Sequence, residues 1–208
     1  MEKLIEINKV KNPIISVIIP TYKEEKYIEP TLIAISNQTL SREKYEIIIS
    51  DSNSKDKTVE IAKKYADKIV ITNKRGIALG KNLGAKYAKG KYLIFIDADT
   101  IILPTMFEEV LKYFKKYDLL YPRVWTKDSS LLYSFYYLIY NFSLSFLKRL
   151  KPQAAGYFIA IKKSLFEKIR GFNENLTTAE DLDLIMRASK LGKVQIINTP
   201  VIVLSFIH

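Results

Sequence analysis

Two aspartates, Asp97 and Asp99, stand directly after a run of five apolar residues at 92–96. Such a run is typical of a strand buried on both faces of a parallel sheet. In an extended backbone, side chains two positions apart lie on the same side, at a sheet edge where α/β proteins usually bind ligands. Two close carboxylates repel each other unless a cation separates them, and a divalent cation carrying phosphate oxygens does so. The alternative is a turn in which Asp99 or Thr100 caps a helix beginning near Pro104.

A second acidic pair, Glu180 and Asp181, follows a loop at 173–178 and opens a predicted helix. Acids in the first turn of a helix are favoured by the backbone dipole, so a capping role explains this pair at little cost. Asp183 and Arg187 are four positions apart on the same helix, and this spacing predicts an ion pair that braces it. The pair at 180–181 therefore keeps two interpretations, a helix cap or a chemical role.

The strands and helices that would position these acids alternate along the chain. Apolar runs predict strands at 14–19, 46–50 and 68–72 in addition to 92–96, and the intervening patterns predict helices at about 27–36, 58–66 and 78–88. This alternation favours right-handed βαβ units and a parallel sheet. The first two strands also end in polar residues, at 20–25 and at Asp51, and three such ends at one edge indicate a nucleotide site.

The composition limits the classes of protein to which the chain can belong. At 208 residues, with 48% apolar and 26% charged residues, it is globular and fits one domain over 1–208. Cysteine is absent, which excludes disulfides and thiolate metal sites. The formal charge of +11 suggests an anionic partner: a phosphate-bearing substrate, a lipid headgroup surface or nucleic acid. We expect a cytoplasmic location, since the start of the chain lacks the apolar core of a signal peptide and no spanning segment is visible.

Several of these segments, taken together in chain order, resemble the motifs of the GT-A family 2 glycosyltransferases. They are Pro20-Thr21-Tyr22 with Glu24, the turn at 51–58, residues 76–84, Asp97-Ala98-Asp99, Gly171-Phe172-Asn173-Glu174 and Glu180-Asp181-Leu182-Asp183 with Arg187. The resemblance runs from about residue 14 to 208. It implies a GT-A fold, a mostly parallel sheet flanked by helices, with a nucleotide-sugar-binding half at about 14–100 and an acceptor-binding half at about 101–208.

The resemblance also implies a donor site for a nucleoside diphosphate sugar, most often a UDP-sugar, with a GDP-sugar as an option. Arg75 and Lys81 would face the diphosphate, since a guanidinium binds phosphate as a fork and an ammonium as a point charge. The family often carries a second acid after Asp51, where this chain has Ser52. The alternative is a purely structural role, in which Pro20 and Thr21 end the strand and Asp51 stabilises the turn that follows it. The residues expected to hold the nucleoside end of the donor are Pro20, Thr21, Tyr22, Glu24 and Asp51.

The same resemblance implies a divalent ion, Mg²⁺ or Mn²⁺. Asp99 would ligate it, Asp97 would contact it or the ribose, and Ala98 would lie between them in the donor site. His208, the single histidine, would be a further ligand, against the alternative of an ordinary surface or packing residue. Bound there, the ion would stabilise the negative charge that builds up on the diphosphate as the bond to the sugar breaks.

In this family the Asp181 position holds the general base of an inverting transfer, with Glu180 the next candidate in this chain. The base would take the proton of an acceptor hydroxyl as it attacks the sugar from the face opposite the diphosphate. A phosphate acceptor is already ionised and would not need this base. The enzyme expected from the resemblance is therefore a glycosyltransferase of the hexosyltransferase type.

An aromatic segment lies within the acceptor-binding half at about 129–150; it carries no charge from 129 to 147, and a basic cluster at 148–151 ends it. Aromatic rings beside cations are typical of an interfacial helix, so a peripheral membrane contact through 129–151 and a lipid-linked or glycan acceptor are expected. A buried helix or a dimer contact explains the same pattern, and the oligomeric state stays open. The membrane interpretation would place the protein at the cytoplasmic face.

Two other classes of function remain as alternatives. A nucleotidyltransferase of the same architecture would have a glycine-rich loop after its first strand, whereas residues 20–25 contain no glycine. A non-catalytic module on an anionic membrane or nucleic acid would explain the charge of +11 but would leave both acidic pairs without a role. Carboxylates repel phosphate when no metal intervenes, so we expect no nucleic-acid partner.

Overall fold

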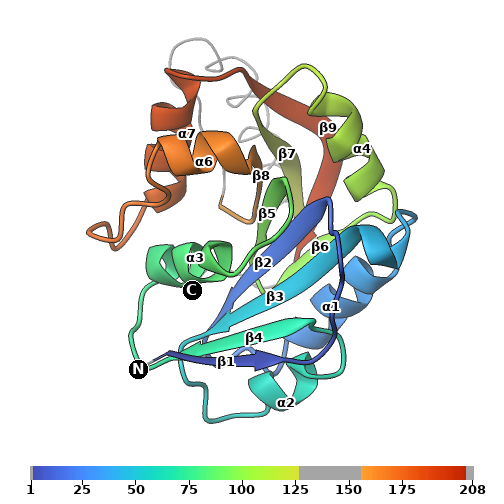
Figure 1. The fold of residues 1–208 in the computed structure, drawn as a ribbon, viewed down its shortest axis with the longest axis vertical. Helices are drawn as coiled ribbons and strands as arrows, with labels where there is room; N and C mark the ends of the chain where they lie inside the picture. Colours follow the sequence, from blue (N-terminus) through green and yellow to red (C-terminus); the bar gives the residue numbers. More distant parts are fainter. Residues whose placement is uncertain (1, 127–155, 205–208) are drawn as a thin grey trace.

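The structure is a computed structural model that describes residues 2–126 and 156–204 (Figure 1). Within these ranges the strands form one sheet in the order β1-β4-β3-β2-β5-β8-β7-β9-β6. The strands are β1 (Glu2–Glu6), β2 (Ile15–Thr21), β3 (Tyr45–Asp51), β4 (Lys68–Thr72), β5 (Tyr92–Ile96), β6 (Thr100–Ile102), β7 (Leu119–Thr126), β8 (Phe158–Lys162) and β9 (Val194–Val203).

Helices cover both faces of this sheet. They are α1 (Ile28–Ser36), the short 3₁₀ helix η1 (Arg42–Lys44), α2 (Thr58–Ala62), α3 (Ile77–Lys86), α4 (Met106–Tyr113), α6 (Lys163–Lys168) and α7 (Glu180–Ser189). Successive strand residues point to opposite faces, so Val17 and Ile19 of β2 pack with α1, α2 and α4, whereas Ile18 packs with α3, α6 and α7. The two core clusters make a three-layer α/β/α arrangement (Figure 1).

The expected βαβ organisation is confirmed in the first half of the chain. Strand β2 pairs in parallel with β3 and β5, and β3 pairs in parallel with β4. The strands predicted at 68–72 and 92–96 have those bounds in the structure. The carboxyl ends of β2, β3 and β5 consequently meet at one edge of the sheet.

The second half departs from the simple pattern. Strand β8 pairs antiparallel with β5, and β7 pairs antiparallel with β8 but parallel with β9. Strands β1, β6, β7 and β8 were not predicted, because their pairing is with distant segments and leaves no local alternation with helices.

Helix α3 packs unusually close to the sheet. A Cβ atom on Gly84 would lie 2.3 Å from Cγ2 of Ile18, and a Cβ on Gly80 would lie 3.2 Å from Cβ of Pro20. Glycine suits position 84 because a side chain there would overlap the Ile18 side chain of β2 unless that side chain moved. The close approach places α3 directly beneath the carboxyl edge of β2.

The aromatic segment at 129–151, for which a membrane contact was expected, lies outside the described residues. Among the helices that the structure describes, none has the length and apolar character needed to cross a bilayer.

Candidate functional site

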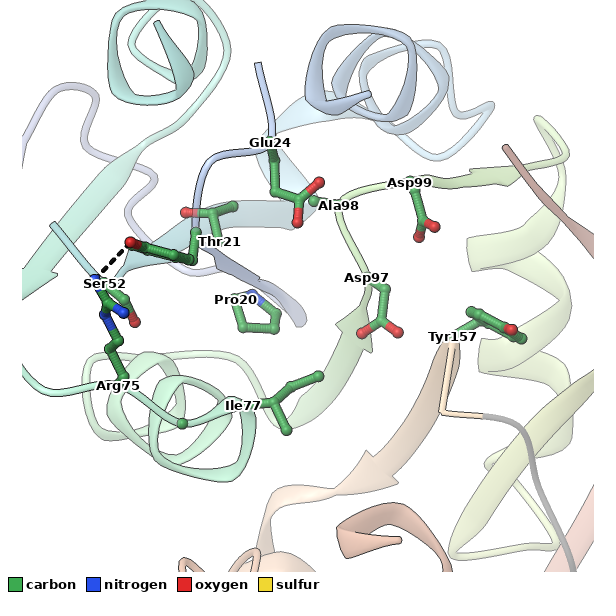
Figure 2. Close-up of a pocket in the computed structure, with 12 residues that line it drawn as sticks. Pro20, Thr21, Glu24, Ser52, Arg75, Ile77, Asp97, Ala98, Asp99 and Tyr157 are labelled. Atoms are coloured by element: carbon green, nitrogen blue, oxygen red, sulfur yellow. Dashed lines mark hydrogen bonds between the residues drawn. The ribbon is translucent and has the colours of Figure 1, made fainter. Parts of the chain in front are cut away.

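A cavity of about 460 Å³ opens where β2, β3 and β5 end (Figure 2). Asp97 and Asp99 lie at one end of it, Ser52 and Arg75 at the other, with Pro20 and Ile77 between them. The cavity therefore has an acidic end and a basic end. The predicted donor-site residues that line it are Pro20, Thr21, Tyr22, Glu24, Arg75, Asp97, Ala98 and Asp99.

The acidic end is a turn and not a continuation of the strand. Strand β5 ends at Ile96, and the N–H of Thr100 donates to the carbonyl of Asp97 at 3.2 Å. The extended-backbone argument for Asp97 and Asp99 is thus wrong, although both side chains do reach the same cavity. The capping alternative is also wrong, because Thr100 begins β6 and α4 starts only at Met106.

Backbone groups of this turn are held from three sides. The N–H of Asp97 donates to the carbonyl of Tyr157 at 3.1 Å, and the Thr31 hydroxyl of α1 donates to the carbonyl of Ala98 at 2.8 Å. The carbonyl of Asp99 accepts from the N–H of Leu204, just after β9, at 2.9 Å. These distant segments therefore fix the backbone of the turn that carries the two carboxylates.

Asp97 shows the electrostatic character of this end. Its Oδ1 atom is buried and has no hydrogen-bond partner within the described residues. Burial raises the pKa of Asp97 to about 6; Lys81 opposes this, while Asp99, Glu180 and Glu24 add to it. A buried carboxylate oxygen without a donor is suited to an external cation.

Asp97 and Asp99 are the side chains at this end that would hold Mg²⁺ or Mn²⁺. The described residues contain no cluster of three or more metal-ligand side chains. Mg²⁺ is usually held by one or two carboxylates, with waters and substrate phosphates completing the shell. Asp97 and Asp99 therefore fit a divalent ion that arrives with a phosphate-bearing substrate, and do not form an all-protein metal cage. His208, the third predicted ligand, lies outside the described residues.

The basic end combines an aromatic ring with a guanidinium. The Cζ atom of Arg75 lies 4.4 Å from the centre of the Tyr22 ring, and its Nη2 donates to the Tyr22 hydroxyl at 2.6 Å. Arg75 is exposed to solvent. This end thus offers a flat aromatic and cationic surface to a ring or a phosphate.

Asp51 is at the predicted sheet edge but behind the cavity wall. It is fully buried, and its Oδ2 accepts from the Thr21 hydroxyl at 2.8 Å and from the Ser54 hydroxyl at 2.7 Å. Its Oδ1 accepts from the N–H of Ser54 at 2.8 Å. In this structure Asp51 holds the turn and Thr21; its contact with a nucleoside stays a prediction.

A second group of charges lies beside the cavity, and we call Lys81, Glu180 and Asp181 the lysine cluster. The Nζ atom of Lys81 donates to Oδ1 and Oδ2 of Asp181 at 2.8 and 3.0 Å and to Oε1 of Glu180 at 3.1 Å. All three residues are buried. Lys81 does not line the cavity, and in this structure its ammonium contacts these acids; its contact with a diphosphate stays a prediction.

The pKa values within the lysine cluster are strongly perturbed. Burial raises the pKa of Asp181 to about 8, with Glu180 and Asp97 adding to the shift and Lys81 opposing it. Burial raises the pKa of Glu180, but Lys81 and hydrogen bonds lower it by more, so the pKa lies below its ordinary value. Burial also disfavours the charged form of Lys81, yet Asp97, Asp181 and Glu180 raise its pKa above the usual value.

Local backbone geometry fixes the position of Asp181. A Cβ atom on Gly156 would lie 1.9 Å from Oδ2 of Asp181, so the backbone at 156 is directly against the carboxylate. The next residue, Tyr157, lines the cavity, which places Asp181 close to the cavity wall. Ala179, just before α7, adopts the left-handed conformation with φ of 61° and supplies no side-chain cap.

Helix α7 is anchored further along. Arg187 donates to Oδ2 of Asp183 at 2.6 Å, which confirms the predicted ion pair. The same guanidinium donates to the carbonyl of Gly171 at 2.8 Å. Asn82, next to Lys81 on α3, exchanges hydrogen bonds with the backbone of Phe172, each of 2.9 Å. Helices α3 and α7 and the loop at 171–174 therefore form one connected support.

Sequence reasoning left several cavity residues out of the predicted site: Ser52, Gly76, Ile77 and Tyr157. Ser52 could have been included because it directly follows Asp51. Tyr157 could not, because it reaches Asp97 only through the antiparallel pairing of β8 with β5, in which Phe158 is opposite Ile96. The ion pairs between Lys81 and Glu180 or Asp181 join residues 99 or 100 positions apart, with no local signal.

The chain is similar in sequence to known glycosyltransferases. A family model described as Glycosyl transferase family 2 matches residues 16–170. An uncharacterized glycosyltransferase of Methanocaldococcus jannaschii is 29% identical over 204 residues, or 87% of this chain and 66% of that protein. The poly(ribitol-phosphate) beta-N-acetylglucosaminyltransferase TarS of Staphylococcus aureus is 34% identical over 93 residues, or 42% of this chain and 16% of TarS. The chain thus spans less than two thirds of the length of these relatives.

Solved structures agree at the level of the fold. S. aureus TarS 1–349 in complex with UDP matches with a TM-score of 0.75 and 21% identity, covering 92% of this chain and 60% of that one. The mannosyltransferase PcManGT from Pyrobaculum calidifontis, in complex with GDP-Man and Mn²⁺, matches with a TM-score of 0.74 and 22% identity, covering 92% and 56%. These likenesses confirm the predicted GT-A α/β fold.

Proposed function

Since the chain belongs to glycosyl transferase family 2, we propose that it transfers a sugar from a nucleoside diphosphate sugar to an acceptor, with inversion at the anomeric carbon. The observation that carries this proposal is that two acidic sites lie near each other, since Asp97 acts electrostatically on Asp181. Asp97 and Asp99 line an open cavity, and Asp181 is buried against Gly156, one residue away from the cavity wall. One site suits the donor and the other suits proton removal.

The donor is proposed to lie along the cavity with its nucleoside at the basic end. Tyr22 and Arg75 offer a flat surface there to the base, and Thr21 is held by Asp51 at the same end. The diphosphate would then extend toward Asp97 and Asp99. A UDP-sugar is supported by TarS, whose structures contain UDP or UDP-GlcNAc. A GDP-sugar is the second candidate, because the PcManGT structure contains GDP-Man.

The residues that would hold Mg²⁺ or Mn²⁺ are Asp99 and Asp97. Their fit rests on the buried Oδ1 of Asp97, which has no donor within the described residues, and on the presence of both carboxylates in the cavity. When bound, the ion would supply positive charge for the leaving diphosphate. PcManGT, which shares the fold, is complexed with Mn²⁺.

The proposed base is Asp181, with Glu180 as the next candidate. As the acceptor hydroxyl attacks the anomeric carbon, its proton passes to a carboxylate oxygen of Asp181. The new bond between the acceptor oxygen and the sugar forms while the sugar–diphosphate bond breaks, and the electron pair leaves with the nucleoside diphosphate. A base with a raised pKa, here about 8, is matched to accepting a proton near neutral pH.

The acceptor is proposed to be a hydroxyl group on a glycan or on a lipid-linked or otherwise anionic carrier. The formal charge of +11 favours an anionic molecule. The names of two relatives, TarS and the minor teichoic acid biosynthesis protein GgaB of Bacillus subtilis, refer to poly(ribitol-phosphate) and teichoic acid. The segment at 129–151, with its aromatic and basic residues, remains our candidate for contact with such an acceptor or a membrane surface.

Donor binding can be tested by thermal shift with uridine, guanosine and thymidine diphosphates, each with and without Mn²⁺. We expect one nucleotide to raise the melting temperature, and to do so more strongly with Mn²⁺, because a ligand that binds the folded state stabilises it. Release of the nucleoside diphosphate from the matching nucleotide sugar would then measure turnover. The absence of any shift with all three nucleotides would contradict the donor proposal.

A further inference from the structure

Lys81 is a fully buried cation, and its surroundings explain how it remains charged. The side chain comes from α3 and has no solvent-exposed area. An ammonium has three N–H donors, and those of Lys81 are directed at Oδ1 and Oδ2 of Asp181 and Oε1 of Glu180. Burying a charge is unfavourable unless it is paired and hydrogen-bonded, and here both conditions are met.

The contact geometry restricts Asp181 from two sides. Both carboxylate oxygens lie within hydrogen-bond distance of one Nζ atom, at 2.8 and 3.0 Å, which sets the plane of the carboxylate. On the other side, the backbone at Gly156 is so close that a Cβ there would lie 1.9 Å from Oδ2. The carboxylate is thus clamped between the ammonium and a glycine backbone next to the cavity residue Tyr157.

The charged groups around Asp181 determine how easily it ionises. Within the described residues, the charged groups that act on Asp181 are Lys81 from α3, Glu180 from α7 and Asp97 after β5. Without Lys81, three carboxylates would share this region with no cation. Burial and the two acids favour the protonated form of Asp181, whereas Lys81 favours the ionised form.

We propose that Lys81 is the positioning residue for the base: its ammonium fixes the orientation of the Asp181 carboxylate and favours the ionised, proton-accepting form over the protonated form that burial favours. This inference rests on the proposed function, because it gives Lys81 its role through Asp181. A helix of the donor half thereby controls a base in the acceptor half. Lys81 itself touches no reacting atom in this scheme and is not a catalytic residue.

Charge variants with opposite expected effects test the proposal. The assay is nucleoside diphosphate release from the nucleotide sugar found by thermal shift, with Mn²⁺ and with water as acceptor, across pH. In the wild-type protein the rate rises as Asp181 loses its proton. Lys81→Met removes the cation, so the rising limb of the pH–rate profile, where Asp181 loses its proton, moves to higher pH by about one unit or more. Glu180→Gln removes a competing acid, so the limb moves to lower pH. Lys81→Arg keeps the cation and retains the wild-type limb.

A double-mutant comparison separates this role from simple structural support. If Lys81 acts through Asp181, Lys81→Met should slow release in the wild-type background but add little in an Asp181→Asn background. Additive losses in the two backgrounds would overturn the proposal, as would a pH limb that stays in place in Glu180→Gln. Because Glu180→Gln preserves shape and removes a buried charge, it remains informative if Lys81→Met does not fold.

A measurement without turnover distinguishes failure of this inference from failure of the proposed function. The infrared carboxyl band that is present in the wild-type protein and absent from Asp181→Asn reports the titration of Asp181 directly. We expect this titration to move to lower pH in Glu180→Gln and to stay in place in Lys81→Arg. If the titration of Asp181 shifts as expected in these variants but no sugar transfer is found, the proposed function alone is overturned. If the titration of Asp181 does not shift in Glu180→Gln, the role of Lys81 is overturned.

Discussion

The two acidic pairs of this protein differ in how their charge is balanced. In the lysine cluster, Glu180 and Asp181 share the buried ammonium of Lys81, which contacts three of their oxygens. At the cavity, Oδ1 of Asp97 is buried without a hydrogen-bond partner in the described part of the chain. The fold supplies the first pair with a cation, whereas Asp97 of the second pair has a buried oxygen to which a cation from outside could bind.

This difference suggests why the two pairs suit different chemistry. A carboxylate with a counter-ion in the fold keeps its orientation whether or not substrate is bound, and the counter-ion makes its ionised form, which a base requires, easier to reach. A pair with a buried, unpaired oxygen gains most when a cation arrives, so its affinity is coupled to the substrate that brings the cation. Asp97 acts on both sites, since it also raises the pKa of Asp181.

The largest expected effect comes from removing the proposed base. Asp181→Asn should lower sugar transfer by about 10²–10⁴, the usual contribution of general base catalysis. Donor affinity measured by calorimetry should stay unchanged, because the cavity acids are intact. Asp183→Asn is the matched control on the same helix, since Asp183 pairs with Arg187 and lies outside the lysine cluster. Full turnover by Asp181→Asn would place the base elsewhere.

The next effect concerns the other pair. Asp99→Asn should weaken Mn²⁺-dependent donor binding by at least about 10–100-fold. Replacing a residue that only supports a metal ligand typically costs this much, and Asp99 is proposed to contact the metal directly. The fold should persist, because the turn is held by the backbone bonds of Asp97, Ala98 and Asp99. Glu60→Gln, an exposed acid on α2, controls for the change in net charge. Calorimetry showing equal donor affinity with and without the substitution would remove the metal role from Asp99.

A smaller effect tests how tightly the paired acid is held. Gly156→Ala would place a methyl group 1.9 Å from the present position of Asp181 Oδ2, so the carboxylate must move. A displacement near 1 Å can cost roughly 10²-fold in rate, and partial relaxation should leave a loss of about tenfold. Donor affinity and melting temperature should change little. Unchanged transfer would show that the clamp on Asp181 is not needed for reaction.

The sequence was sufficient to predict the parts of this site that arise from local pattern. Apolar runs followed by polar residues located the strand ends at Pro20-Thr21 and at Asp97-Asp99, and most of the donor-site residues do line one cavity. The i,i+2 argument reached that result for the wrong reason, since residues 97–99 form a turn. Position at the strand end, and not strand geometry, was the useful signal.

What could not be predicted depends on contacts between distant segments. The buried partners of Lys81 could not be predicted, because nothing near residue 81 indicates that α7 packs against α3. The buried contacts of Asp51 with Thr21 of β2 and with Ser54 of the following turn could not be predicted either, and its contact with a nucleoside stays a prediction. Local sequence identifies a charged residue and the edge it belongs to, whereas its partner is fixed only when the helices pack on the sheet.

The smallest expected effect is on stability and concerns strain beside the paired acids. Ala179 has φ of 61°, whereas the turn at Asp97–Asp99 has no residue in the left-handed region. That conformation costs an alanine about 1–2 kcal/mol, and glycine removes the cost at an entropic penalty of roughly 0.5–1 kcal/mol. Ala179→Gly should therefore stabilise the fold by about 0.5–1 kcal/mol in urea unfolding. Ala34→Gly, in the right-handed helix α1, is the matched control and should destabilise by a similar amount. If Ala179→Gly also destabilises, the left-handed residue is not strained, and the rigidity of the lysine cluster comes from its ion pairs alone.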